Sequence, residues 1–151
     1  MEYSKITDLL FVGTTPKPQD YNLLRDLGVH LVINMRAERP PYRDPGSPPI
    51  NTLWIPTFDS PLLPISLKSL QRGVQAALET INSDRIVYSH CAAGMHRSVA
   101  LASSILIALG YTLEEAMALI KQRREVADPH AWYIQRRIKR FAQFWEQFNT
   151  A

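Results

Sequence analysis

The sequence has a single cysteine, Cys91, among its 151 residues. One cysteine cannot form a disulfide within the chain, and it cannot build a structural zinc site that uses two or four cysteines. Packing or chemical reactivity is therefore the role left for Cys91. Because chains without disulfides are typical of reducing compartments, we expect a cytoplasmic protein.

Long apolar runs are also absent. No stretch reaches the roughly 18 apolar residues of a membrane span, and Glu2 and Asp8 stand where a secretory signal would be basic. The formal net charge is only +3, from 17 Lys and Arg against 14 Asp and Glu. That surplus is too small to indicate a nucleic-acid partner. We therefore expect neither a membrane nor a nucleic acid as a partner.

The remaining composition is that of one packed domain. Glycine is scarce, at 6 residues, while 46% of the residues are hydrophobic. A chain of this length usually forms a single domain, so we expect one catalytic domain over residues 1–151.

Short apolar runs alternate with segments of helical apolar spacing. Strands are predicted at 9–12, 29–34, 53–56 and 86–89. Helices are predicted at 19–27, 67–81, 99–109, 112 to about 124, and from Pro129 to about 148, with an irregular loop over 36–49. Ser66 and Thr112 are predicted helix caps, the latter in a capping box with Glu115. This alternation predicts an α/β fold, a three-layer domain with a mostly parallel central sheet flanked by helices.

The segment HisCysAlaAlaGlyMetHisArgSer at 90–98 follows the last predicted strand. In α/β sheets, ligands bind beyond the carboxyl ends of the strands. A tight turn into a helix start directs several backbone N–H groups inward and adds a partial positive charge, so it suits a tetrahedral oxyanion. The same field lowers a cysteine pKa from about 8.5 to roughly 3.5–7.5. Cys91 is therefore a candidate nucleophile at neutral pH.

Three neighbours complete this constellation. Arg97, six positions after Cys91, can bind two phosphate oxygens through its planar guanidinium. The hydroxyl of Ser98 can donate to the sulfur and so help the thiolate leave a phosphocysteine. Gly94 can adopt the positive φ of a tight turn without a Cβ clash.

This pattern, His90-Cys91, five residues, then Arg97-Ser98, resembles the signature loop of the cysteine-based protein tyrosine phosphatase superfamily, in its dual-specificity branch. The similarity extends from 10–13 and 32–34 through the C-terminal helices. It implies that Cys91 is the nucleophile, that Arg97 binds phosphate, that Ser98 assists hydrolysis of the intermediate and that His90 supports the loop. The loop residues expected to bind substrate are Ala92, Ala93, Gly94, Met95, His96 and Arg97. The resemblance implies neither a metal nor a cofactor.

The leaving group also needs a proton, and Asp59 is the best candidate donor. It follows the strand at 53–56 and stands 32 residues before Cys91, and the acid of the resembled family has a similar spacing. Alternatively, Asp59 only shapes a turn before Ser-Pro. Asp44 and Asp128 are weaker rivals, and Asp128 before Pro129 is better explained as a helix cap.

We therefore expect a protein phosphatase that hydrolyses phosphotyrosine most readily, with phosphoserine and phosphothreonine as further candidates, through a phosphocysteine. Its partner would be a phosphorylated protein or peptide. Inositol phosphate or inositol pyrophosphate phosphatases remain an alternative, since His96-Arg97 resembles a pair in that branch, although the loop has no added positive charge. A non-catalytic phosphoprotein-binding module is a further alternative. A rhodanese-like or arsenate-reducing enzyme is disfavoured, because such enzymes usually require further cysteines and this chain has only Cys91. The sequence does not indicate an oligomeric state.

Overall fold

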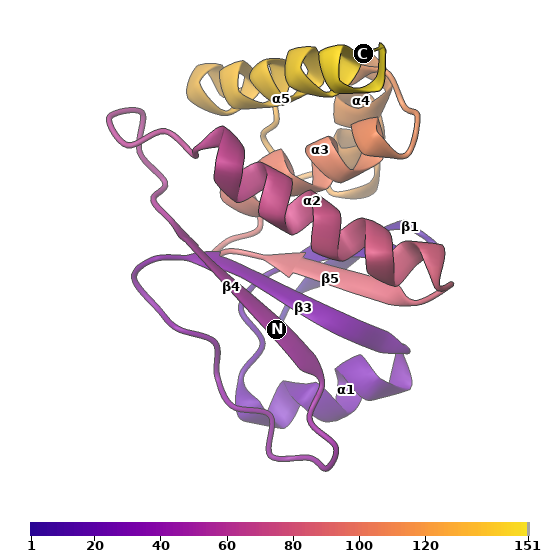
Figure 1. Ribbon diagram of the computed structural model, residues 1–151. Coiled ribbons are helices and arrows are strands. Elements are labelled where there is room, and N and C mark those ends of the chain that lie inside the picture. Colours follow the sequence, from indigo (N-terminus) through magenta and orange to yellow (C-terminus); the bar gives the residue numbers. More distant parts are fainter. Residues whose placement is uncertain (151) are drawn as a thin grey trace.

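The computed structural model describes residues 1–150 (Figure 1). Its strands are β1 (Tyr3–Thr7), β2 (Leu10–Gly13), β3 (Val29–Arg36), β4 (Asn51–Thr57) and β5 (Ile86–His90). Its helices are the 3-10 turn η1 (Pro18–Asp20), α1 (Tyr21–Asp26), α2 (Leu67–Asn82), α3 (Arg97–Ala108), α4 (Leu113–Arg123) and α5 (Trp132–Thr150).

The five strands form one sheet in the order β1-β2-β5-β3-β4. Strands β2, β5, β3 and β4 run parallel to one another, and β1 pairs antiparallel with β2 at the edge. The predicted strands are confirmed, but β1 was not predicted. Its sequence, TyrSerLysIleThr, has no alternating apolar pattern that would predict a strand, and only Ile6 of it is buried.

Alternate residues of the strands face opposite layers. In β2, Leu10 and Val12 belong to a large core beneath α2, α3, α4 and α5, whereas Phe11 belongs to a smaller core with α1. Figure 1 shows α1 on one side of the sheet and the other four helices on the opposite side. The predicted three-layer α/β architecture is confirmed.

Helix α3 is the rigid support of this core. It is buried around its whole circumference, because it contacts β5 and the helices α2, α4 and α5. Burying each of its Val, Leu and Ile side chains contributes about 1.5–3 kcal/mol. The first turn of α3, which follows β5 closely, is therefore held in a fixed position.

The predicted caps are confirmed. Ser66 accepts a hydrogen bond from the Ser69 N–H, and Thr112 forms its capping box with Glu115. Two predicted helix boundaries were wrong. The segment 19–27 splits into η1 and α1, and the last helix begins at Trp132 and not at Pro129.

Within residues 1–150, no helix combines the length and apolar character that crossing a bilayer requires.

Candidate active site

The carboxyl ends of the parallel strands meet at one edge of the sheet, and the segment of residues 91–96, called here the 91–96 loop, joins β5 to α3 there. Gly94 has a φ of +65°, as predicted. A Cβ atom at this position would lie 2.8 Å from the Gly13 carbonyl oxygen. Conformation and space therefore both require glycine in this turn.

Cys91 lies at the floor of the loop and is 3% exposed. Its Sγ is 3.2 Å from the Ser98 Oγ. Burial raises the pKa of the Cys91 thiol, but the hydrogen bonds from Ser98, the charge of Arg97 and the Gly94 N–H outweigh burial, so the net pKa is lowered. The structure therefore brings Cys91, Ser98 and Arg97 together in the way the sequence predicts.

His90 is buried beneath the start of the loop. Its Nδ1 lies 3.4 Å from the carbonyl oxygen of Cys91, and the Thr15 hydroxyl donates to the same oxygen at 3.1 Å. Burial lowers the pKa of His90 to about 4, so its imidazole is neutral at pH 7. His90 is thus a buried, neutral neighbour of the Cys91 backbone.

Arg97 is 4% exposed and forms a double hydrogen bond with Glu38. Its two terminal nitrogens lie 2.7 Å and 2.9 Å from the two carboxylate oxygens of Glu38, and the first also donates to the Thr57 carbonyl at 2.9 Å. Its Nε is buried without a hydrogen-bond partner among the described residues. The guanidinium is therefore fixed in place and still has one free buried donor.

Glu38 itself responds strongly to this contact. The hydrogen bonds from Arg97 lower the pKa of Glu38 to about 2, although its side chain is 46% exposed. The carboxylate is therefore ionised at all pH values near neutrality.

Arg124 supports the 91–96 loop through hydrogen bonds to its backbone. This side chain is 2% exposed, and it donates to the carbonyl oxygens of Gly94 at 2.8 Å and Ala93 at 3.0 Å. It also donates to the Ser4 Oγ and to the Glu2 carboxylate on the N-terminal segment. Because these carbonyls point toward Arg124, the loop shape is coupled to the edge strand β1.

Asp59 lies beside the outer part of the loop. Its Oδ2 is 3.0 Å from the Nδ1 of His96, and its Oδ1 accepts a hydrogen bond from the Tyr133 hydroxyl at 2.6 Å. Burial raises the pKa of Asp59, but the hydrogen bonds from Tyr133 and His96 and the charges of His96 and Arg97 lower it further than burial raises it. Both carboxylate oxygens of Asp59 therefore contact residues distant in sequence, His96 and Tyr133, and not the backbone of the turn before Ser60-Pro61.

The two rival aspartates have other surroundings. Asp44 is buried in the 37–50 loop, where it pairs with Arg25 and accepts the backbone N–H groups of Gly46 and Ile50. The prediction that Asp128 caps the last helix was wrong. Asp128 precedes the helix by four residues, and its Oδ2 lies 3.5 Å from the Nε2 of His96.

The other loop residues face outward to different degrees. Ala92 and Ala93 are exposed, while Met95 and His96 are half-buried. The carbonyl of Met95 accepts the backbone N–H of Asp128, which ties the loop to the segment before α5. In residues 1–150, no three His, Cys, Asp or Glu side chains are grouped so as to hold a metal ion.

Three residues of the site were not predicted. Glu38 follows the carboxyl end of β3, and the rule that parallel strands end at one edge could have identified it. Arg124 and Tyr133 belong to distant helical segments, and no local pattern in the sequence marks them.

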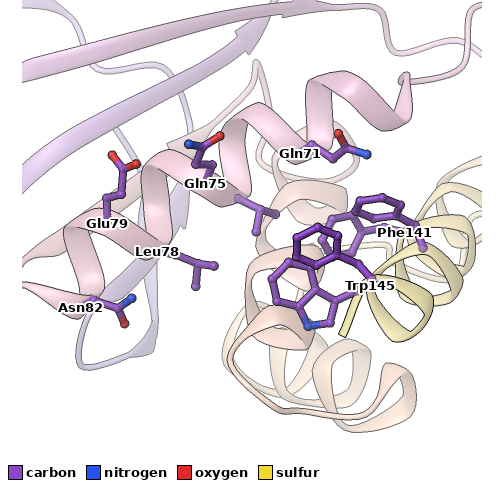
Figure 2. Close-up of a pocket in the computed structure, with 10 residues that line it drawn as sticks. Gln71, Gln75, Leu78, Glu79, Asn82, Phe141 and Trp145 are labelled. Atoms are coloured by element: carbon purple, nitrogen blue, oxygen red, sulfur yellow. The ribbon is translucent and has the colours of Figure 1, made fainter. Parts of the chain in front are cut away.

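A separate groove of about 470 Å³ lies between α2 and α5 (Figure 2). Its walls include Val74 and Leu78 from α2 and Phe141, Phe144 and Trp145 from α5. None of its lining residues belongs to the 91–96 loop. The groove is therefore distinct from the candidate active site.

The chain is similar to known proteins over most of its length. A family model described as the dual specificity phosphatase catalytic domain matches residues 10–141. Mouse dual specificity phosphatase 28 is 26% identical over 129 residues, which cover 85% of this chain and 77% of that protein. The structure of human DUSP28 matches with a TM-score of 0.84 at 22% identity, over 95% of both chains. The structure of PTPMT1 in complex with PI(5)P matches with a TM-score of 0.82 at 24% identity, over 97% of this chain and 98% of that one.

Proposed function

Because the chain belongs to the dual specificity phosphatase family and is a cysteine-dependent phosphatase, we propose that it hydrolyses phosphotyrosine most readily and does so through a phosphocysteine. Phosphoserine and phosphothreonine are slower substrates in this proposal. The observation that carries the phosphate-binding part of this proposal is the buried Nε of Arg97, which has no partner among the described residues. A buried donor without a partner costs about 1–3 kcal/mol, and a phosphate oxygen above Cys91 would satisfy it.

In the first step, the thiolate of Cys91 attacks phosphorus. The loop N–H groups and Arg97 bind the equatorial oxygens, where negative charge spreads in the transition state. Because Arg97 is held by Glu38 before substrate arrives, little reorganisation is needed. Asp59 protonates the leaving oxygen.

In the second step, water attacks the phosphocysteine and Asp59 accepts its proton. The Cys91 sulfur then leaves as a thiolate. Ser98 lies 3.2 Å from this sulfur, so its hydroxyl can donate to the developing negative charge.

The exposed aromatic side chains near the site favour an aromatic phosphomonoester. Because Cys91 is only 3% exposed, a substrate must extend its phosphate group into the loop, and phosphotyrosine has a longer side chain than phosphoserine. Phe58 precedes Asp59 in the sequence and is 53% exposed. Trp132 precedes Tyr133 and is 62% exposed. The side chains of Phe58 and Trp132 can pack against the phenyl ring and the residues that flank it.

An inositol phosphate or phosphoinositide is the second candidate substrate. It is supported by the similarity to PTPMT1, whose structure contains PI(5)P, and by His96 in the loop. The side chains of Ala92, Ala93 and Met95 weaken this alternative, because they add no positive charge for further phosphates. A non-catalytic phosphoprotein-binding module is weaker still, since binding alone needs neither Cys91 nor the nearby hydroxyl of Ser98.

We propose the cytoplasm as the location, because the reaction needs Cys91 as a free thiolate and reducing compartments keep thiols reduced. A phosphorylated protein or peptide is the proposed partner.

A substrate panel tests this proposal. Phosphotyrosine and phosphoserine peptides, PI(5)P in micelles and inositol hexakisphosphate are assayed at equal concentrations, with Cys91→Ser as the control and EDTA present throughout. We expect the highest kcat/KM on phosphotyrosine and no turnover by Cys91→Ser. In Ser98→Ala, a phosphoenzyme should accumulate during turnover and be trapped by acid quenching. Wild-type turnover by Cys91→Ser would refute the mechanism, and a higher kcat/KM on either inositol compound would refute the substrate.

A further inference from the structure

Four side chains from separate segments meet beside the 91–96 loop. The imidazole of His96 lies between two carboxylates: its Nδ1 is 3.0 Å from Asp59, and its Nε2 is 3.5 Å from Asp128. The hydroxyl of Tyr133 donates to Asp59 at 2.6 Å and lies 3.3 Å from the same Nδ1. A histidine is therefore held directly against the carboxyl group proposed as the general acid.

These contacts conflict with a simple role for Asp59. Burial acts to raise the pKa of Asp59, but Tyr133, His96 and the charge of Arg97 lower it overall, so the carboxyl alone is ionised near pH 7. A general acid must hold a proton when the leaving group departs. Of the groups that face Asp59, Arg97 retains its proton, and burial and Asp59 raise the pKa of Tyr133 to about 12. Histidine is the side chain type that exchanges protons near neutrality.

We propose that Asp59 and His96 share one proton between Oδ2 and Nδ1, and that Tyr133 and Asp128 hold this pair in place. The Nε2 of His96 lies 3.5 Å from the Asp128 carboxylate, which favours a proton on Nε2 and leaves Nδ1 as the atom that exchanges the proton with Asp59. The inference rests on the proposed function, because it assigns the source of the proton for the same reaction. His96 acts through Asp59 and is a positioning residue in this scheme.

The shared proton balances both steps. While sulfur bonds to phosphorus, the bond from phosphorus to the leaving oxygen breaks and its electron pair remains on that oxygen. The shared proton passes from Asp59 to the oxygen. In the second step, water gives a proton to Asp59 as its oxygen bonds to phosphorus and the electron pair of the sulfur–phosphorus bond returns to Cys91. The pair of Asp59 and His96 then holds one proton again.

The sign of a pH shift separates proton sharing from simple hydrogen bonding. His96→Asn keeps an N–H near the position of Nδ1 but cannot carry the proton. If the pair shares its proton, the basic limb of the kcat profile should move to lower pH, and kcat on phenyl phosphate at pH 7 should fall about tenfold or more. If His96 only donates a hydrogen bond, the Asn amide replaces this donor and the limb stays in place, or moves to higher pH because the charge of His96 no longer lowers the pKa of Asp59. A limb that moves upward or stays in place overturns the proposal.

Asp128→Asn keeps the test valid if His96→Asn folds poorly. Tyr133→Phe removes one donor to Asp59 and should move the basic limb to higher pH whichever role His96 has, so it checks that the limb reports Asp59. Asp128→Asn removes the charge that faces Nε2, so the limb should move to lower pH, and an unmoved limb in this variant also counts against proton sharing. The control variants are His30→Asn and Tyr111→Phe, which make the same chemical changes away from the site and should leave the profile unchanged.

A measurement without catalysis separates this inference from the proposed function. In Cys91→Ser protein, ¹⁵N resonances of the histidines report which ring nitrogen carries the proton, and there are only four histidines to assign. We expect neutral His96 to carry its proton on Nε2, and an Nδ1–H form would overturn the inference whatever the enzyme does. If Asp59→Asn keeps the basic limb of the wild type, the proposed general acid is wrong. If Asp59→Asn removes the basic limb while His96→Asn moves it to higher pH, the general acid is correct and only proton sharing is wrong.

Discussion

The contact between Glu38 and Arg97 leads to a prediction about stability as a function of pH. The hydrogen bonds from Arg97 lower the pKa of Glu38 from 4.5 to about 2. At about 1.4 kcal/mol for each pKa unit, this shift corresponds to an upper limit of about 3 kcal/mol. Because Glu38 is 46% exposed, solvent screening reduces the contribution to about 1–1.5 kcal/mol. Glu38→Gln keeps one acceptor for Arg97, so we expect it to cost about 1 kcal/mol at pH 7.

The pH dependence follows from the direction of the shift. A carboxyl whose pKa is lower in the folded state stabilises the fold fully above its unfolded pKa, and this stabilisation is lost as the pH falls toward the folded value. The deficit of Glu38→Gln should therefore be constant from pH 7 to about pH 5 and shrink between pH 5 and pH 3.

Urea unfolding of wild type and Glu38→Gln at several pH values measures this deficit. Glu79→Gln serves as the control, because it removes the same charge from an exposed position on α2. It should change the free energy of unfolding by less than about 0.5 kcal/mol at every pH. A Glu38→Gln deficit that is absent at pH 7, or equally large at pH 3, would refute the reasoning.

Two further predictions concern the support of the 91–96 loop. Arg124→Met removes the donors to Ala93 and Gly94 and should cost about 2–3 kcal/mol in urea unfolding and weaken vanadate inhibition, whereas exposed Arg123→Met should change neither. Gly94→Ala should cost more stability than Gly110→Ala: both positions have positive φ, but only a Cβ at Gly94 meets backbone, and the conformational cost alone is about 1–3 kcal/mol. Equal losses in either pair would contradict the assigned contacts.

The local part of the site could be predicted from sequence. The strand, the glycine turn and the helix start at 86–98 are contiguous, so the positions of Cys91, Arg97 and Ser98 follow from local geometry. Asp59 was predicted because a strand end places it at the correct edge of the sheet.

The supporting contacts could not be predicted in this way. Tyr133 meets Asp59 across 74 residues of sequence, and Arg124 meets Gly94 across 30. Such contacts depend on how α4 and α5 pack over the core, and helical periodicity fixes only which face of each helix is buried. Asp128 was misassigned for a related reason. Asp before Pro is compatible with both a turn and a helix start, and the backbone bond to Met95 decides between them.

The single cysteine also means that a thiol-specific reagent can modify this chain at one position only. Because no other thiol occurs in the 151 residues, every alkylation of a thiol modifies Cys91 in the 91–96 loop, and the mass shift of the intact protein reports the accessibility of Cys91. Peroxide converts a cysteine thiolate to a sulfenic acid, and at Cys91 this acid finds no second thiol within the chain. Recovery from oxidation must therefore use a thiol from outside the protein or a reversible bond to backbone nitrogen, and the redox state of the surroundings directly sets the fraction of usable enzyme.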